Sequence, residues 1–116
     1  MDVSMLDSMS EQVRRFCEER DWSKFHNAKD LAIGISTEAS ELLEIFRFQR
    51  EDDVKRLFSQ PDTREHIEDE IADVLFFLLR FAQMNDISLP RALSRKIEKN
   101  AAKYPVEASR GSNAKR

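Results

Sequence analysis

Two long stretches of the sequence, residues 27–49 and 62–85, repeat apolar residues with the period of an α-helix. On a wheel turning about 100° per residue from Glu38, Leu31 lies near 20° and Leu42 near 40°. At about 1.5 Å per residue, a helix over residues 27–49 is roughly 35 Å long. Strand-like alternation and internal repeats are lacking, so the sequence predicts an all-α fold: a small bundle of four to five helices with two long central ones.

Shorter helices are expected around these two. A first helix over about residues 10–21 would begin at Ser8 or Ser10, with Val13 and Phe16 facing inward. A short connecting helix would end near Ser59, and the next would open at Pro61 with Asp62 or Thr63 near its cap. Ser88 would cap a last helix from Leu89 to about Tyr104. We expect one domain over residues 1–105 and a disordered tail over 106–116.

Composition fits a soluble, helix-rich protein, with 35% charged and 41% hydrophobic residues but two glycines and three prolines among 116 residues. The net charge of -3 disfavours nucleic acid as a stable partner. Cys17 is the single cysteine, which excludes an internal disulfide and favours a cytoplasmic location. The polar, acidic start does not resemble a signal peptide, and the longest apolar run, VLFFLL at 74–79, is too short to cross a membrane.

The run from Val74 to Leu79 is apolar almost all the way round its helix. One neighbouring helix cannot cover such a surface. Because a chain of this size has few helices to offer, we expect part of the cover to come from another subunit.

Acidic residues interrupt both apolar faces. Glu38 lies inside its apolar arc and Glu41 at the edge of it, at about 300°. Glu70 lies among the apolar residues of the second long helix, and Asp73 follows one turn later. The pattern ExxE at 38–41 is thus repeated as ExxD at 70–73, and a spacing of three places both acids of a pair on one side of one turn.

Burying an ionised carboxylate without a partner costs several kcal/mol, so four of them facing one another need compensating cations. Arg80 is the one base near these faces on the wheel. A divalent ion is the economical alternative, and a carboxylate-rich set suits Mg²⁺ or Mn²⁺. A solvated ExxE face with no metal is the competing interpretation. A di-iron centre is disfavoured because neither His26 nor His66 has an acid three residues before it, and Cys17 lacks an evident base for nucleophilic catalysis.

Three segments, DWSKFHNAKDLAIGISTEASELLEIFRF, EDEIADVLFFLLRFA and LSRKIEKNAAKYP, carry a resemblance to a known family. Together they resemble the MazG-like all-α nucleoside triphosphate pyrophosphohydrolases, particularly the dCTPase-like branch. The paired acids, the preceding W-x-x-F-H stretch and the closing K-x-x-x-N-x-x-x-Y-P occur in the family's order, from about Trp22 to Pro105. The family commonly forms dimers or tetramers, so the resemblance also implies a homodimer or homotetramer.

The resemblance implies Mg²⁺-dependent hydrolysis of a (deoxy)nucleoside triphosphate, such as dCTP, to the monophosphate and pyrophosphate. It implies that Glu38, Glu41, Glu70 and Asp73 hold the metal. Lys96, Asn100 and Tyr104 would contact the phosphates or close the site, and Trp22 and His26 would lie on the base and sugar side. Phe48 stands where the dCTPase-like branch often has Trp, which leaves the base preference open.

Positioned carboxylates fit this chemistry, because metal ions that bridge phosphates and carboxylates neutralise charge and hold phosphorus in line with a water. Among the four acids we expect Glu41 to orient or deprotonate that water. Two alternatives stay open at this point. One is a non-catalytic helical protein–protein interaction module; the other is the same fold acting on a different nucleotide, such as dUTP or a damaged purine.

Overall fold

The structure is a computed structural model that describes residues 4–114. The chain forms two compact units, Met1–Asn85 and Asp86–Arg116. All regular structure in the described part is helical, which confirms the all-α class. The first unit contains α1 (Met5–Glu19), the short 3-10 helix η1 (Ser23–Phe25), α2 (Ala28–Phe46), α3 (Glu51–Ser59) and α4 (Pro61–Met84). The second contains α5 (Leu89–Lys103) and α6 (Val106–Ser109), so the described residues form six α-helices rather than the expected four to five.

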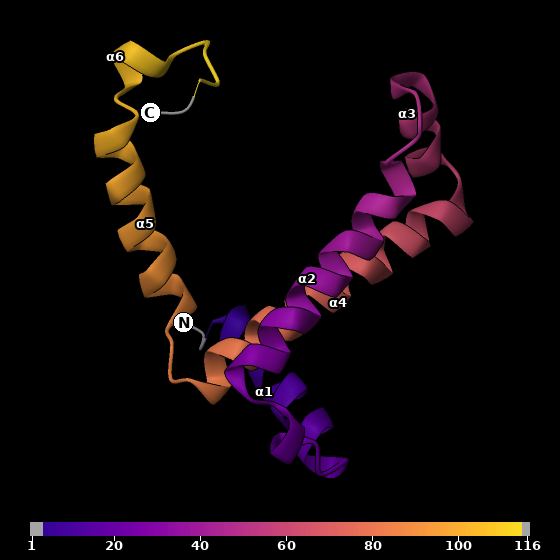
Figure 1. The fold of residues 1–116 in the computed structure, drawn as a ribbon, viewed down its shortest axis with the longest axis vertical. Helices are drawn as coiled ribbons and strands as arrows, with labels where there is room; N and C mark the ends of the chain where they lie inside the picture. The colour runs from indigo at the N-terminus through magenta and orange to yellow at the C-terminus, as the bar shows by residue number, and fades with distance from the viewer. Residues whose placement is uncertain (1–3, 115–116) are drawn as a thin grey trace. The chain divides into compact units, whose positions relative to one another are not determined.

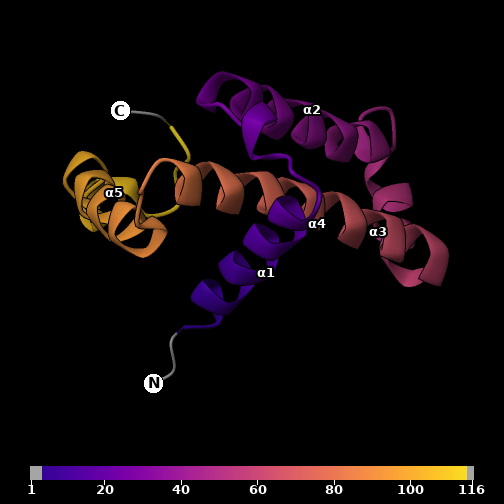
Figure 2. The same ribbon diagram turned by 90° about the horizontal axis from the view of Figure 1, so that it is seen from below.

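The long helices α2 and α4 lie side by side along most of their length, with α3 at one end linking them (Figure 1). The view turned by 90° shows the same pairing and shows α1 crossing α4 at an angle on another side (Figure 2). Helix α4 therefore contacts α1, α2 and α3, and it is the central element of the first unit.

The N-cap of α2 follows from its sequence. The side chain of Asn27 accepts a hydrogen bond from the Asp30 backbone N–H at 2.8 Å and donates one to the Asp30 carboxylate at 2.9 Å. Asparagine at this position satisfies one of the N–H groups that every helix start leaves free. The helix ends at Phe46, three residues before the expected end at Gln49.

Two expected N-caps are wrong. Helix α1 is capped by Ser4, whose hydroxyl accepts from the Asp7 N–H at 3.1 Å, so Ser8 and Ser10 lie inside the helix. Helix α4 is preceded by Gln60, with Pro61 at its first position. In place of capping, the Thr63 hydroxyl donates to the backbone carbonyls of Leu57 and Gln60, which ties the start of α4 to the end of α3.

The core of the first unit is small and lies where α1, α2 and α4 meet. Its fully or nearly buried apolar residues are Val13, Cys17, Leu31, Ile67, Leu79 and Ala82. Val13 faces inward as expected, whereas Phe16 is 40% exposed. Cys17 is a free, buried thiol; burial is the main cause that raises its pKa, which fits an idle side chain rather than a nucleophile.

Ser88 caps α5 as expected, by accepting from the Arg91 N–H at 3.4 Å. The segment after Pro105 begins with the single helical turn of α6. The single domain over residues 1–105 and the disorder of the tail stay predictions. No helix among residues 4–114 has the length and hydropathy that a membrane span requires.

Helices α2 and α4 approach closely at Gly34. A Cβ atom at this position would lie 2.8 Å from the Phe77 ring of α4, well inside van der Waals contact. Glycine in a helix interior costs about 1 kcal/mol relative to alanine. The close approach of the Phe77 ring to the α2 backbone is the physical reason for glycine at this position.

We therefore expect Gly34→Ala to lower the melting temperature despite its better helix propensity, because overpacking costs about 1–3 kcal/mol. Phe77→Leu removes the ring that the new methyl group meets. In that background Gly34→Ala should become neutral or stabilising, so a double-mutant cycle of thermal unfolding measures the contact directly. Equal effects of Gly34→Ala in both backgrounds would contradict this account.

Candidate metal and nucleotide site

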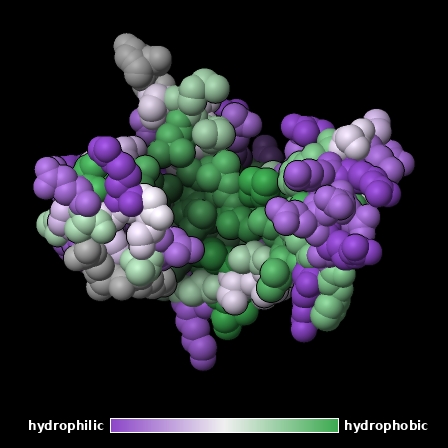
Figure 3. Space-filling view, turned by 90° about the horizontal axis from the view of Figure 1, so that it is seen from above, coloured by the Kyte–Doolittle hydropathy of each residue, from purple (hydrophilic) through white to green (hydrophobic). Residues whose placement is uncertain are grey.

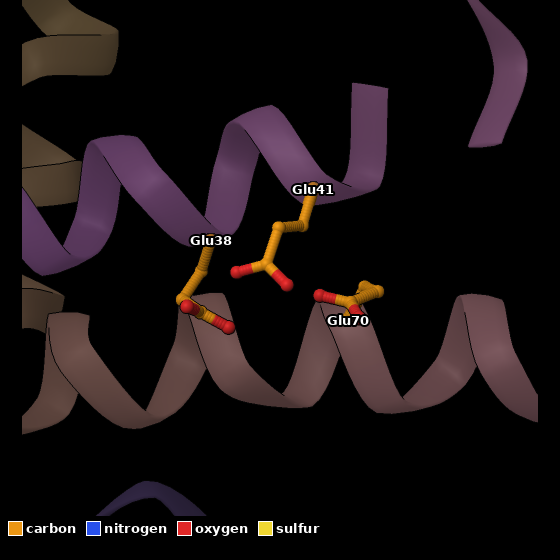
Figure 4. Close-up of side chains that lie close together, drawn as sticks. All are labelled: Glu38, Glu41 and Glu70. Carbon is orange, nitrogen blue, oxygen red and sulfur yellow. The ribbon is translucent and has the colours of Figure 1, made fainter. Parts of the chain in front are cut away.

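Three carboxylates converge between the two long helices. Glu38 and Glu41 extend from consecutive turns of α2, and Glu70 extends from α4 toward them (Figure 4). One oxygen from each of the three lies within 4.8 Å of the others. The structure thus brings together three of the four acids that the sequence singled out as metal ligands.

Glu70 is the most enclosed of these acids, with 9% of the residue exposed. Its Oε1 lies 3.4 Å from Nε2 of His66, one turn earlier on α4. Its Oε2 is buried and has no hydrogen-bond partner among the described residues. A buried carboxylate oxygen without a partner is costly, so this atom is a ready ligand for a cation.

The pKa of Glu38 is raised from its ordinary 4.5 to about 7. Burial contributes most, hydrogen bonding to the carboxyl groups of Glu41 and Asp73 comes next, and their negative charges add to it. Without a cation, the protonated form of this glutamate is favoured up to a higher pH than usual, because a further negative charge would be poorly compensated.

Asp73, the fourth expected ligand, interacts with Glu38 but does not belong to the group of three oxygens within 4.8 Å. It is exposed and lies in the wall of a neighbouring cavity. Glu44 is also exposed and pairs with Arg47 on the surface at 3.2 Å. Asp73 therefore joins two parts of the site, the carboxylate cluster and the cavity.

The cavity has a volume of about 510 Å³ and is largely aromatic. Its wall consists of Gln12, Val13, Phe16, Trp22, Asp73, Phe76 and Phe77. The Phe16 ring meets the Trp22 ring edge to face at 5.6 Å and the Phe76 ring at 5.8 Å. Such a wall offers flat apolar faces beside one carboxylate, which suits a planar ring that carries a charged group.

Three of these wall residues, Phe16, Phe76 and Phe77, were missed as site residues, because the helical period assigns them to the core. Gly34 was a usable signal, since a helix-interior glycine indicates a close approach by a large side chain on the facing helix. Trp22 lies in the cavity wall, with 37% of the residue exposed.

His26 and Arg80 are linked to each other rather than to the acids. The Arg80 guanidinium donates to Nδ1 of His26 at 2.9 Å. Arg80 is therefore not paired with the carboxylates that lie nearest to it on the helical wheel. Burial, and then the positive charge of Arg80, lower the pKa of His26.

The remaining residues expected to bind substrate are not among those that line the aromatic cavity. Phe48 is 83% exposed and lies beneath the Arg47 guanidinium at 4.7 Å, outside the cavity wall. Lys96 and Asn100 are exposed on α5, one turn apart, and Tyr104 follows at the end of that helix. Because these last three belong to the second unit, their contact with phosphates stays a prediction.

A family model, curated proteins and a solved structure all show similarity to this chain. The model of the MazG-like family matches residues 33–115. The dCTP pyrophosphatase 1 of Rattus norvegicus is 36% identical over 109 residues and that of Homo sapiens 31%, each match covering 90% of this chain. The crystal structure of a pyrophosphatase from Archaeoglobus fulgidus superposes with a TM-score of 0.82 at 37% identity, covering 90% of this chain and 96% of that one.

This chain spans 64% of the length of the curated relatives. The family model, by contrast, covers well over half of the chain, including α4, α5 and most of α2. The chain therefore belongs to the MazG-like family.

Proposed function

We propose that this protein is a Mg²⁺-dependent nucleoside triphosphate pyrophosphohydrolase that acts on a deoxynucleoside triphosphate, dCTP or a close relative. The observation that carries this proposal is the convergence of Glu38, Glu41 and Glu70 between two helices, with a buried, unpartnered oxygen on Glu70. The names of the curated relatives and of the similar solved structure support the reaction and the base.

The donor set fits a divalent metal ion. All three converging groups are carboxylates, and oxygen ligands suit Mg²⁺ or Mn²⁺ better than zinc. Glu38, Glu41 and Glu70 would hold the ion directly, and Asp73 would complete the set from one turn beyond Glu70. When bound, the ion would neutralise phosphate charge and favour departure of pyrophosphate.

The protein side chains supply the rest of the chemistry. Glu41 is the exposed member of the carboxylate cluster, and we assign to it the orientation or deprotonation of the attacking water. Lys96, Asn100 and Tyr104 would bind the phosphate tail, the first through its positive charge.

The aromatic cavity is the proposed place of the base. Trp22 and Phe16 offer ring faces for stacking, and Asp73 lies in the wall shared with the acidic cluster. Asp73 therefore links the proposed place of the base to the carboxylates proposed to act on the phosphates. We assign Trp22 and His26 to the base and sugar side, and we propose Phe48 as a further substrate-binding residue through its exposed ring.

The competing function is a non-catalytic helical interaction module. It would leave the acids replaceable and would require neither metal nor nucleotide. The unpartnered Glu70 oxygen and the raised pKa of Glu38 favour the enzyme, because a surface serving protein contacts has no need to converge carboxylates. A cytoplasmic location and the lack of a nucleic-acid partner stay predictions from the sequence.

We further propose that the protein is a homodimer or homotetramer. Large apolar side chains of the first unit are exposed, among them Ile33, Leu43, Ile71 and Leu78. Hydrophobic residues also gather on part of the face drawn in Figure 3. Monomeric proteins rarely expose contiguous apolar surface of this kind.

Glu70→Gln should reduce turnover of dCTP with Mg²⁺ by roughly a thousandfold or more, because it replaces the most enclosed anionic ligand by a neutral group. Release of pyrophosphate and dCMP measures the effect, and circular dichroism verifies the fold. Glu68→Gln is the matched control, since Glu68 lies on the same helix in an exposed pair with Arg64. Full turnover by Glu70→Gln would contradict the metal assignment.

The stability of the metal-free protein should depend on pH through Glu38. Its pKa is about 7 when folded and near 4.5 when unfolded, so the folded state binds more protons between these values. The stabilisation from the Glu38 proton is therefore complete below about pH 4.5 and is lost as pH rises through about 7.

With chelator present, the melting temperature should fall more steeply between about pH 5.5 and pH 8 for the natural protein than for Glu38→Gln. Added Mg²⁺ should restore stability at the higher pH in the natural protein alone. Identical pH profiles for the two proteins would show that Glu38 does not titrate in this range.

Sedimentation equilibrium should give a mass about two or four times that of the 13.6 kDa chain. The physical reason is burial of the exposed apolar side chains between copies. A stable monomer at protein concentrations of about 50 μM would contradict the proposed assembly.

A further inference from the structure

Arg80 is a fully buried cation outside the carboxylate cluster, with 0% of the residue exposed. Its guanidinium donates three hydrogen bonds. Nε donates to Nδ1 of His26 at 2.9 Å, Nη2 to the Ser23 hydroxyl at 2.9 Å, and Nη1 to Oε1 of Gln83 at 2.7 Å. Gln83 in turn donates to the carbonyl and hydroxyl of Ser10 at 2.8 Å, so the network joins α4 to both α1 and η1.

All three partners of Arg80 are neutral. Histidine accepts at Nδ1 only when that nitrogen carries no proton, and the ion pairs between described residues do not include Arg80. Removing a cation from water without a neighbouring anion is energetically costly, so the hydrogen bonds of Arg80 must compensate for the lost hydration. An apolar side chain of similar size would be buried here at a lower free-energy cost. This comparison indicates that the three hydrogen bonds serve to hold the segments they join in place.

The segment that these hydrogen bonds hold in place is the short turn after α1. Ser23 begins η1 and His26 follows its end, so one guanidinium holds both ends of this turn. The turn is entered through Asp21, whose φ of 55° lies in the left-handed region that residues other than glycine seldom adopt. A turn with this strain benefits from an anchor in the core.

Trp22 is the residue that this turn positions. It precedes η1 directly, its backbone N–H donates to the Cys17 carbonyl at 3.0 Å, and its ring lies edge to face with the His26 ring at 6.1 Å. The same ring forms part of the aromatic cavity wall. Displacing η1 would therefore move a wall of the cavity.

The Arg80 contact also fixes the proton of His26. Because Nδ1 accepts from Arg80, the neutral ring carries its hydrogen on Nε2. His26 is thus held as a hydrogen-bond donor at Nε2 and in one ring orientation. Either a loss of Arg80 or a rotation of the ring would release that constraint.

We propose that Arg80 is a positioning residue, which through Ser23 and His26 holds the η1 turn so that the Trp22 ring forms its part of the aromatic cavity wall and the His26 ring keeps its hydrogen on Nε2. This proposal rests on the proposed function for the identity of the ligand, a nucleotide base. It predicts that Arg80 governs affinity for the base, whereas the carboxylate cluster governs turnover.

The test compares two serine-to-alanine variants. Ser23→Ala removes the Arg80 bond at the turn, and Ser10→Ala removes a hydroxyl from the far end of the same network without touching Arg80 or η1. We expect Ser23→Ala to raise KM for dCTP roughly fivefold with kcat within about twofold, and Ser10→Ala to leave both unchanged. Trp22 is the sole tryptophan, so its fluorescence reports the turn directly. Acrylamide should quench it more readily in Ser23→Ala than in Ser10→Ala.

Arg80→Met should act more strongly, with KM higher by about tenfold or more, since bonds to a charged donor are the strong ones. Arg80→Lys retains the charge but cannot make the fork of bonds, so it should not rescue affinity. In ¹⁵N spectra of the natural protein, the His26 ring should show a protonated Nε2 and an unprotonated Nδ1. In Arg80→Met that preference should weaken; a His66→Gln background assigns the signals, because the chain has two histidines.

Unchanged quenching and unchanged KM in Ser23→Ala would overturn the proposal, even if Arg80→Met failed to fold. Equal changes in Ser23→Ala and Ser10→Ala would also overturn it, because they would indicate general loosening of the first unit. If the natural protein turned over no nucleotide, the proposed function would fail. The quenching and ¹⁵N measurements would still decide whether Arg80 holds the turn.

Discussion

Repulsion between like charges is the constraint on which the site depends. Three carboxylates lie within 4.8 Å of one another at the junction of α2 and α4, and this junction also packs the two longest helices together. In the metal-free molecule part of this repulsion is avoided by keeping a proton on Glu38, whose pKa is raised to about 7. A proton and a divalent ion are alternative solutions to the same electrostatic problem, and the second also serves phosphate chemistry.

Close packing of the helix pair makes this convergence possible. Gly34 lets the Phe77 ring approach the α2 backbone, one turn before Glu38 on the same helix. A larger residue would push the helices apart at the place where their acids must meet. Phe77 also lies in the cavity wall, so a single contact sets both the separation of the helices and one side of the aromatic cavity.

Much of this could be predicted from the sequence because helical period and acid spacing are local properties. Residues three and four apart share a face, so the positions of Glu38, Glu41 and Glu70 on their helices followed directly. The caps were harder, since Ser4, Ser8 and Ser10 compete for one role and local sequence alone does not rank them.

Contacts between residues far apart in the chain could not be predicted from the sequence. Arg80 lies 54 residues from His26 and 57 from Ser23, and the helical wheel gave it no contact except with nearby acids. The aromatic cavity could not be predicted for the same reason, because its wall combines residues of α1, the turn after it and α4. Periodicity identifies which side chains leave solvent, but it cannot distinguish a filled core from a hollow one.

Helix α4 connects these features in one rigid element. Asp73 and Arg80 are seven residues apart, which places them two turns apart on one face, with Phe76 and Phe77 between them. One end of this face meets the carboxylates and the other holds the η1 turn, and the cavity wall lies between. Because a helix bends little over this length, the distance from the carboxylate cluster to the Trp22 wall depends on the positions of these residues along α4. Discrimination between bases would then depend on the turn at one end of that face, and catalysis on the acids at the other.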